Sequence, residues 1–341
     1  MNVWRRILTG ILTLSLLAGI SAAVSGKEAA GIVGPENGKE RGAEAAEEPV
    51  KDTEAETVQD KRLWAYQAVH AGAGESLGYD GTGVRIAVLD TGIRSTHEVF
   101  EGAVIEPGKD YTGSESGGTN DYVGHGTMVA SLIAAQPGNG LGMKGIAPGA
   151  SLIPLKCFDG EKAVVSVLSQ AIYDAVNVYH CDIIHMSWGV REEDEELKAA
   201  VRYAADRGII LIAAAGNEGG EEVFYPSGWT EAIGVGAAGR ELKTADYSAK
   251  SPAVLVNAPG TGIFGAGHTS DRAETFRTGT SYAAAYVTGA AALAVQAVPG
   301  ITGQELADVL LESARETEGN TEGLSPDTMF LDIGALLRRL L

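Results

Sequence analysis

From residue 84 onward, the sequence alternates short apolar runs with stretches of helical spacing. The apolar runs include VRIAVLD, SLIPLKCF, DIIHMSW, GIILIAAAG, AIGVGA and AVLVNAPG, and they lack the polar alternation of a strand with one face in water. Between them lie HGTMVASLIAAQ, AVVSVLSQAIYDAVNVY and EEDEELKAAVRYAADRG, in which apolar residues recur at helical spacing. This order predicts a three-layer α/β fold, with a mostly parallel central sheet covered by helices on both faces.

Polar or glycine-containing clusters follow three of the predicted strands. Asp90 ends the first, residues 187–189 follow the third, and residues 216–217 follow the fourth. Each cluster taken alone is ordinary turn chemistry. In a parallel sheet, however, ligands bind beyond the carboxyl ends of the strands, so these clusters are expected at one edge. Their occurrence together with GHGT and GTS favours a catalytic site at that edge.

Ser281 lies in TFRTGTSYAAAYVTGAAALA, between a Gly-Thr pair and a run of small side chains. A serine hydroxyl becomes a nucleophile when a neutral imidazole takes its proton, and a carboxylate can hold that imidazole. His125, flanked by glycines, and Asp90, at a strand end, supply these two groups. Asn217 is a suitable donor to the oxyanion that the attack would create.

Six blocks carry a resemblance to a known family: AVLDTGI, GHGTMVAS, MSWG, AAAGNEG, NAPG and GTSYAAAYVTGAAAL. In this order they resemble the subtilisin-like serine peptidases, and the likeness runs from about Trp64 to the C-terminus. The resemblance implies the subtilisin-like fold, a triad of Asp90, His125 and Ser281, and Asn217 as the oxyanion donor. It also implies that the primary specificity pocket and the substrate-pairing segments are formed by Ser187, Trp188, Gly189, Ala214, Ala215 and Gly216.

The sequence departs from the family pattern at several positions near these blocks. Met128 stands where the family has a second histidine, and Tyr282 begins a block that usually reads Met-Ala-Ser-Pro-His. His185 replaces a common asparagine within an apolar run, where we expect it to pack in the core. Phe224 falls near the base of the primary pocket; it either favours small side chains at the cleaved position or packs beneath the loop.

No cofactor is expected. Calcium sites are common in the resembled family, but Val99 stands where a helper aspartate is frequent, and the loop QPGNGLGMKG offers only Asn139 as a side-chain oxygen ligand. Hard cations take six or more oxygens, so the sequence does not support calcium. Residues 26–60 are also too short and too polar to be the folded propeptide of many secreted relatives.

The N-terminal part divides into two segments before the peptidase domain, which we place at residues 61–341. Residues 1–25 read as a signal peptide, with a basic start, an apolar run and small residues at the end, and an uncleaved version would anchor the chain to a membrane. Residues 26–60 hold ten acidic and four basic side chains and no aromatic residue, which predicts a disordered acidic linker. The expected location is therefore extracytoplasmic, either secreted or membrane-anchored.

Charge and cysteine content narrow the partners. The formal net charge of -19 disfavours nucleic acids and anionic membrane surfaces, because both would repel the protein. The only two cysteines, Cys157 and Cys181, lie in or beside apolar runs, so we expect buried thiols and no disulfide. The expected partner is a polypeptide substrate, and the sequence does not indicate an oligomeric state.

The sequence therefore predicts a serine endopeptidase that hydrolyses peptide bonds through an acyl-enzyme. One alternative is a peptide ligase or cyclase that passes the same acyl group to an amine, which only the altered block after Ser281 supports. Another is a catalytically silent peptide-binding module. The presence of all four polar residues, Asp90, His125, Ser281 and Asn217, argues against the silent module.

Overall fold

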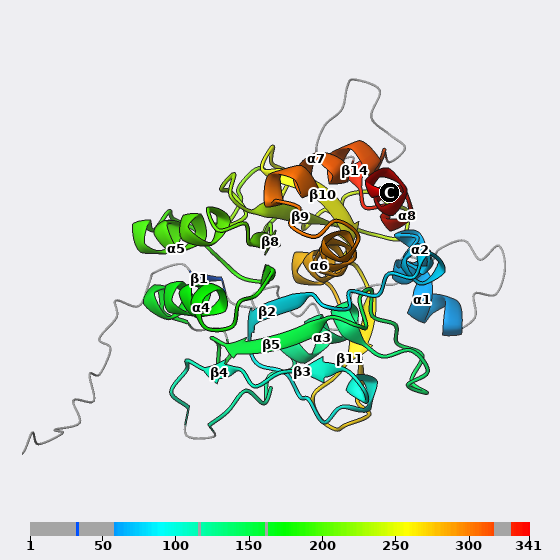
Figure 1. Ribbon diagram of the computed structural model, residues 1–341, viewed down its shortest axis with the longest axis horizontal. Coiled ribbons are helices and arrows are strands. Elements are labelled where there is room, and N and C mark those ends of the chain that lie inside the picture. Colours follow the sequence, from blue (N-terminus) through cyan, green and yellow to red (C-terminus); the bar gives the residue numbers. More distant parts are fainter. Residues whose placement is uncertain (1–31, 34–57, 115–116, 161–162, 317–328) are drawn as a thin grey trace, which may run out of the picture.

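The computed structural model describes residues 32–33, 58–114, 117–160, 163–316 and 329–341. Its centre is a ten-stranded sheet in the order β13-β14-β10-β9-β8-β6-β2-β5-β3, with β4 also paired to β5 (Figure 1). All neighbouring pairs are parallel except β13 and β14. The strands are β2 (Arg85–Asp90), β3 (Val104–Ile105), β4 (Lys109–Asp110), β5 (Ser151–Lys156), β6 (Ile183–Met186), β8 (Ile210–Ala214), β9 (Ile233–Ala238), β10 (Val254–Pro259), β13 (Arg315–Glu316) and β14 (Met329–Phe330).

The central strands are buried on both faces, as their continuous apolar sequences predict. Every residue of β6, β8 and β9 is buried, and β2 is buried from Ile86 to its last residue. β2 lies between β5 and β6, with Asp90 opposite Lys156 and Leu89 opposite Met186. The prediction of a mostly parallel α/β sheet is therefore confirmed.

Helices cover both faces of the sheet and close two apolar cores. Helices α3 (His125–Ala134) and α6 (Thr280–Ala297) contact each other and belong to the larger core. Helices α4 (Val165–Asn177) and α5 (Glu195–Ala205) pack on the opposite face, around the second core. Figure 1 shows α4 and α5 together at the left and α6 on the other side of β8. The remaining helices are α1 (Val58–Ala68), α2 (Gly72–Leu77), α7 (Gly303–Ser313), α8 (Ile333–Leu340) and the 3-10 turn η1 (Glu98–Phe100).

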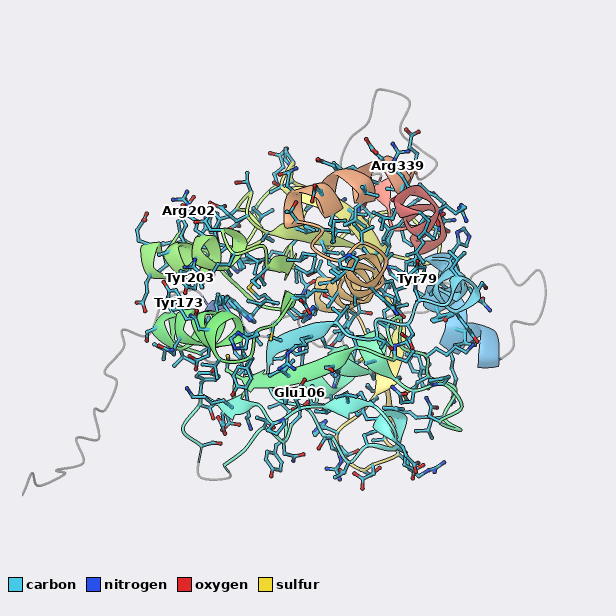
Figure 2. All side chains as sticks on the ribbon, in the orientation of Figure 1. Tyr79, Glu106, Tyr173, Arg202, Tyr203 and Arg339 are labelled. Carbon is cyan, nitrogen blue, oxygen red and sulfur yellow. The ribbon has the colours of Figure 1, made fainter. Side chains whose placement is uncertain are left out.

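The α4–α5 layer shows how local sequence sets the helix ends. Asp194 caps α5 by accepting hydrogen bonds from the backbone N–H groups of Glu196 and Leu197. Gly208 follows the helix in a left-handed conformation with φ of 77°, which is common for a glycine after a helix end. Figure 2 labels Tyr173 of α4 and Tyr203 of α5, whose rings meet edge to face with centroids 5.0 Å apart.

Two parts of the predicted acidic linker carry regular structure. The strand β1 (Ile32–Val33) pairs antiparallel with β7 (Gly189–Val190), with Ile32 opposite Val190 and Val33 opposite Gly189. Both linker residues are β-branched, which suits a strand. The helix α1 begins at Val58, so the regular structure of the C-terminal part starts before residue 61.

Neither membrane insertion nor disulfide formation appears in the described part of the chain. None of its helices combines the length and the apolar character needed to cross a membrane. The predicted signal peptide at residues 1–25 lies outside the described residues. Cys157 and Cys181 are buried free thiols, as predicted, and burial raises the pKa of Cys181 to about 12 and that of Cys157 well above its ordinary value. Both thiols therefore remain protonated at neutral pH and behave as small apolar side chains.

Candidate active site

Asp90 and His125 form a buried pair at the carboxyl edge of the sheet. Nδ1 of His125 lies 2.9 Å from each carboxylate oxygen of Asp90, and the Asp90 side chain is fully buried. Asp90 also accepts a hydrogen bond of 2.7 Å from the backbone N–H of Thr91. Because the carboxylate accepts from Nδ1, a neutral imidazole in this position carries its proton on Nδ1 and leaves Nε2 as a base.

The turn that places His125 at the start of α3 depends on Asp121, which the sequence analysis missed. The Asp121 carboxylate accepts from the backbone N–H groups of Val123, Gly124 and Thr127 at 2.7–2.9 Å, and from the Thr127 hydroxyl at 2.7 Å. Gly124 itself has φ of 106°, a conformation that favours glycine. The signal for this role is an acidic residue just before a helix start, where a carboxylate satisfies free N–H groups.

Ser281 lies in the first turn of α6, in the same layer of the fold as α3. Ser281 is only 6% exposed, and its hydroxyl donates to the backbone carbonyl of Ser187 across 3.4 Å. That distance is long for an O–H···O hydrogen bond, so the hydroxyl is weakly held. The next residue, Tyr282, places its ring beside the His125 imidazole, with centroids 5.5 Å apart. The substitution in the block after Ser281 therefore directly contacts the histidine.

The amide of Asn217 is oriented by Thr280, which precedes Ser281. Its Oδ1 accepts from the Thr280 backbone N–H at 2.9 Å and from the Thr280 hydroxyl at 3.1 Å. Thr280 Oγ1 also accepts from the backbone N–H of Gly216 at 3.2 Å. Since Oδ1 is engaged on the Thr280 side, the Nδ2 donors of Asn217 are available for a ligand.

His185 lies in the core, as predicted, and also contacts the site. Its side chain is fully buried, and Nδ1 lies 2.8 Å from the Thr288 hydroxyl, which itself donates to the Ala284 carbonyl. Since that hydroxyl proton is used, Nδ1 is the donor, and Nε2 accepts from the Ser187 hydroxyl. Burial lowers the pKa of His185 to about 4. His185 is therefore neutral near pH 7, and it orients the residue whose carbonyl contacts Ser281.

The segments predicted to form the primary pocket flank the same edge, although not every side chain faces it. Trp188 is 2% exposed and packs in the second core, with its ring 6.2 Å from that of Phe158. Ala214 ends β8, and Ala215 lies in a small separate core. Gly189 and Gly216 instead both lie against Phe224, Gly189 near its Cβ atom and Gly216 near its ring.

In the loop QPGNGLGMKG, several carbonyl oxygens are already held by side-chain donors. The Asn139 amide turns its Nδ2 donors toward the carbonyls of Gln136 and Met143, at 2.7 and 2.8 Å. Arg62 donates to the Leu141 carbonyl at 3.1 Å. An amide and a guanidinium therefore hold the oxygens that a hard cation would need. In the described part of the chain, no three His, Cys, Asp or Glu side chains gather in a way that could hold a metal ion.

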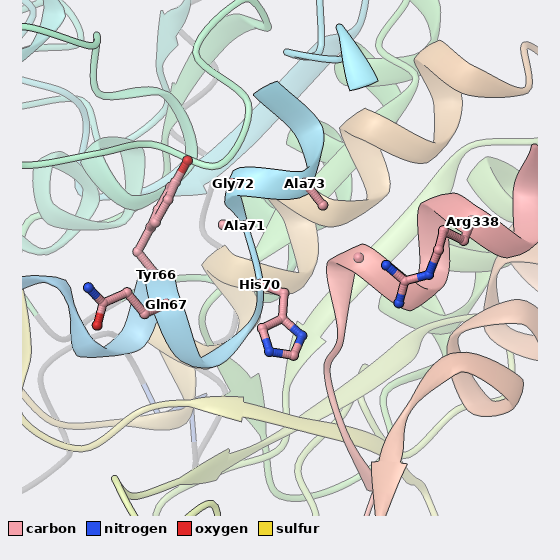
Figure 3. A pocket seen from close by; sticks show the side chains of 8 residues that line it. Tyr66, Gln67, His70, Ala71, Gly72, Ala73 and Arg338 are labelled. Carbon is pink, nitrogen blue, oxygen red and sulfur yellow. The ribbon is translucent and has the colours of Figure 1, made fainter. Parts of the chain in front are cut away.

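A pocket of about 370 Å³ lies elsewhere, between the α1–α2 segment and α8 (Figure 3). Its lining includes Tyr66, His70 and Arg338, and Nδ1 of His70 lies 2.9 Å from an Asp332 carboxylate oxygen. None of Asp90, His125, Asn217 and Ser281 lines it. This pocket and the cluster of polar residues at the sheet edge are thus separate features.

Asp90 holds His125, and Ser281 lies on the helix turn whose next residue, Tyr282, contacts the imidazole. An acid, a histidine and a serine are the residue types that serine hydrolases use. Within that class, the subtilase family model matches residues 81–329 of this chain. The chain therefore belongs to the subtilase family, and it is a subtilisin-like serine endopeptidase.

Individual relatives agree with this assignment. The chain is 36% identical to the major intracellular serine protease of Bacillus subtilis (strain 168) over 230 residues, which is 63% of this chain and 69% of the relative. It is 34% identical to subtilisin BL of Lederbergia lenta over 256 residues, 74% of this chain and 90% of that protein.

Solved structures show the same fold. The structure of MycP1 without its N-terminal propeptide matches with a TM-score of 0.69 and 26% identity, covering 81% of this chain and 98% of that one. The prenylagaramide maturation protease PagA matches with a TM-score of 0.67 and 29% identity, covering 79% and 98% of the two chains. The predicted subtilisin-like fold is therefore confirmed.

Proposed function

We propose that the protein hydrolyses polypeptides through an acyl-enzyme formed on Ser281, with His125 as the proton carrier and Asp90 as its anchor. The observation that carries this proposal is the Asp90–His125 pair, in which both carboxylate oxygens lie 2.9 Å from Nδ1. This contact leaves Nε2 as the basic nitrogen. The position of Tyr282 against the imidazole ties His125 to the helix turn that carries Ser281.

The proposed reaction has two steps. In the first, Oγ of Ser281 attacks the scissile carbonyl carbon while Nε2 of His125 takes the hydroxyl proton, and that proton then passes to the amine as the C–N bond breaks. In the second, water attacks the resulting ester, gives a proton to Nε2, and releases the acid as Oγ regains the proton. Asp90 stabilises the imidazolium in both steps without itself taking up the proton.

The oxyanion of each step would be held by Nδ2 of Asn217 and by the backbone N–H of Ser281. The support is the fixed orientation of the Asn217 amide, whose oxygen is occupied by Thr280. The Ser281 N–H lies in the first turn of α6, where backbone N–H groups lack partners within the helix. Removing a side-chain donor of this kind costs about 100- to 1,000-fold in turnover.

The peptide backbone would pair with β7 as an added antiparallel strand, beside the segment that follows β8. The chain's own β1 pairs with β7 in this way, which supports strand addition at this edge. The proposed substrate-contacting residues are Ser187, Trp188 through its backbone, Gly189, Ala214, Ala215 and Gly216. This reaction needs no metal or organic cofactor. An extracytoplasmic location remains a proposal that depends on residues 1–25.

Covalent labelling tests the assignment. A fluorophosphonate probe should label the wild type and the Ser313→Ala control, in which a buried serine of α7 is lost, but not Ser281→Ala. The same pattern should appear in the release of fragments from an unfolded protein substrate. Labelling that persists in Ser281→Ala would refute the role of Ser281. A folded wild type that neither labels nor cleaves would instead indicate the silent binding module.

The ligase or cyclase alternative is separated from hydrolysis by product analysis. The enzyme is incubated with a peptide substrate and an added amine nucleophile, and the products are identified by mass. Hydrolysis predicts mainly free acids, because water reaches the ester. A majority of amide products at modest amine concentration would favour the acyl-transfer enzyme and would leave the roles of Ser281 and His125 unchanged.

A further inference from the structure

Phe224 fills the space between the two chain segments that flank Ser281. A Cβ atom added to Gly216 would lie 2.2 Å from Cδ2 and 2.5 Å from Cε2 of the Phe224 ring. A Cβ atom added to Gly189 would lie 2.5 Å from Cβ of Phe224. The aromatic side chain is therefore in van der Waals contact with the backbone on both sides, and it is only 3% exposed.

The backbone around Phe224 fixes this position. Tyr225 and Val190 exchange two backbone hydrogen bonds of 2.8 and 2.9 Å, which join the Phe224 segment to β7. The Phe224 N–H points to the Ala215 carbonyl at 3.4 Å, and its own carbonyl accepts from the Ser227 hydroxyl at 2.7 Å. These hydrogen bonds from both flanking segments hold the backbone that carries the ring.

The outer side of the ring is covered by a charged cluster. The Arg191 guanidinium lies 5.0 Å from the Phe224 ring centroid. It also pairs with Glu218 at 3.2 Å and with Glu222 at 3.5 Å. A cation over an aromatic face is favourable, and the two carboxylates hold it there. The Phe224 side chain is therefore bounded by Gly189 at its base, by Gly216 along its ring and by Arg191 over the ring face.

The chemistry at Ser281 determines which substrate group meets this ring. The scissile carbonyl must lie at Ser281 Oγ with its oxygen toward Asn217, and the peptide that precedes it must follow β7. The side chain just before the cleaved bond then points between residues 187–189 and residues 214–216. Phe224 occupies that gap.

We propose that Phe224 closes the primary specificity pocket, so that the enzyme cleaves after glycine, alanine or serine and rejects aromatic and long aliphatic side chains. This inference rests on the proposed peptidase function of Ser281. Inserting a large side chain beside the ring would require overpacking or backbone movement, which is unfavourable in a closely packed site. Differences of one methylene group already change the specificity ratio by about 10- to 200-fold.

The test is a series of peptides that differ only in the residue before the cleaved bond: glycine, alanine, serine, leucine or phenylalanine. The kcat/KM values are calculated with the concentration of active sites, which is titrated with the fluorophosphonate, so that misfolded enzyme does not lower them. The wild type should prefer alanine over phenylalanine by at least about 100-fold. In Phe224→Ala the phenylalanine peptide should gain at least about 100-fold, while the alanine peptide changes by less than about tenfold.

Two further variants complete the design. Phe224→Val replaces the ring by two methyl groups, with less loss of packing than alanine, and should give an intermediate gain for the leucine peptide. Phe276→Ala removes a half-exposed phenylalanine of β12 (Glu274–Arg277) and should leave the preference of the wild type unchanged.

Three outcomes would overturn the inference. One is a wild type that cleaves after phenylalanine or leucine as well as after alanine, and another is an unchanged preference in both Phe224 variants; either result leaves the peptidase assignment standing. The third is a folded wild type with no Ser281-dependent labelling or cleavage, which refutes the proposed function and this inference with it.

Discussion

Nδ1 of His125 lies 2.9 Å from both carboxylate oxygens of Asp90, so one N–H is shared between two acceptors. The Asp90 side chain is fully buried and that of His125 is 5% exposed, so water does not compete for this contact. The pair therefore fixes both the ring orientation and the site of its proton. This relationship makes the carboxylate of Asp90 the group whose charge can be tested most directly.

Replacing Asp90 with asparagine should lower kcat by about 10,000-fold with little change in KM. The new amide can donate to Nδ1, which stabilises the imidazole tautomer that cannot take the serine proton. The fold should persist, because the remaining oxygen can still accept from the Thr91 N–H. Steady-state kinetics and circular dichroism check this, with Asp246→Asn at a fully exposed site as the control. A loss below tenfold would rule out the anchoring role of Asp90.

Stability should fall as the pH falls below about 6.5 because of His185. Burial lowers its pKa in the folded protein to about 4, whereas an unfolded chain has a pKa of about 6.5. Above the pKa of the unfolded chain, His185 is neutral in both the folded and the unfolded state, so it does not change the free energy of unfolding. Between about 6.5 and 4, only the unfolded state takes up the proton, which lowers the free energy of unfolding by about 3 kcal/mol at most.

Denaturant unfolding near pH 7 and near pH 4.5 measures this difference. His185→Asn should show a smaller drop than the wild type, whatever its stability at neutral pH. His180→Asn is the control, since His180 is exposed and its positive φ of 47° suits asparagine. Equal drops in wild type and His185→Asn would show that His185 does not carry this pH dependence.

Chelation should leave the protein unchanged, whereas loss of Arg62 should destabilise it. EDTA is expected to shift neither the thermal midpoint nor the activity, because Arg62 and Asn139 hold the loop carbonyls.

Arg62→Ala should lower the free energy of unfolding by about 1.5–3 kcal/mol, because the Leu141 carbonyl loses a charged donor and Glu274 loses a partner at 2.7 Å. Calorimetry checks both, with exposed Lys243→Ala as the control. A clear loss of stability on chelation would contradict this prediction and would indicate that the protein binds a stabilising cation.

Gly289→Ala should destabilise α6, although alanine is normally the better helix residue by about 1 kcal/mol. A Cβ atom at this position would lie 2.4 Å from Cβ of Ile146, so the helix would have to shift away from the α3 side of the core. Gly303 of α7 has no atom within 4 Å of such a Cβ, so Gly303→Ala should be neutral or stabilising. Chemical denaturation of both variants measures the contrast. Similar stability changes in the two variants would mean that α6 can shift to accommodate the added methyl group at little cost.

Much of the fold could be predicted because the long strands have simple local causes. The six apolar runs correspond to β2, β5, β6, β8, β9 and β10, each buried on both faces. The strands β3, β4, β13 and β14 have two residues each, which is too short for any periodicity. Their position is set by neighbours rather than by their own sequence.

The site could be predicted only in part. Asp90, His125, Asn217 and Ser281 follow from residue type, order and resemblance, whereas their supports follow from contacts between distant segments. Asp121 was missed because its four hydrogen bonds form only once the turn before α3 is folded. The contact of Tyr282 with the imidazole, and the position of Phe224 between Gly189 and Gly216, likewise arise from tertiary packing.

Because β1 pairs with β7, a peptide that binds to β7 as proposed would compete with a segment of the same molecule. A substrate that adds to β7 as proposed would use the strand edge that residues 32–33 occupy. A covalently attached competitor has a local concentration that dilution of the enzyme does not lower. For the proposed strand addition, substrate binding would therefore have to displace β1, and dilution of the enzyme alone would not favour that displacement.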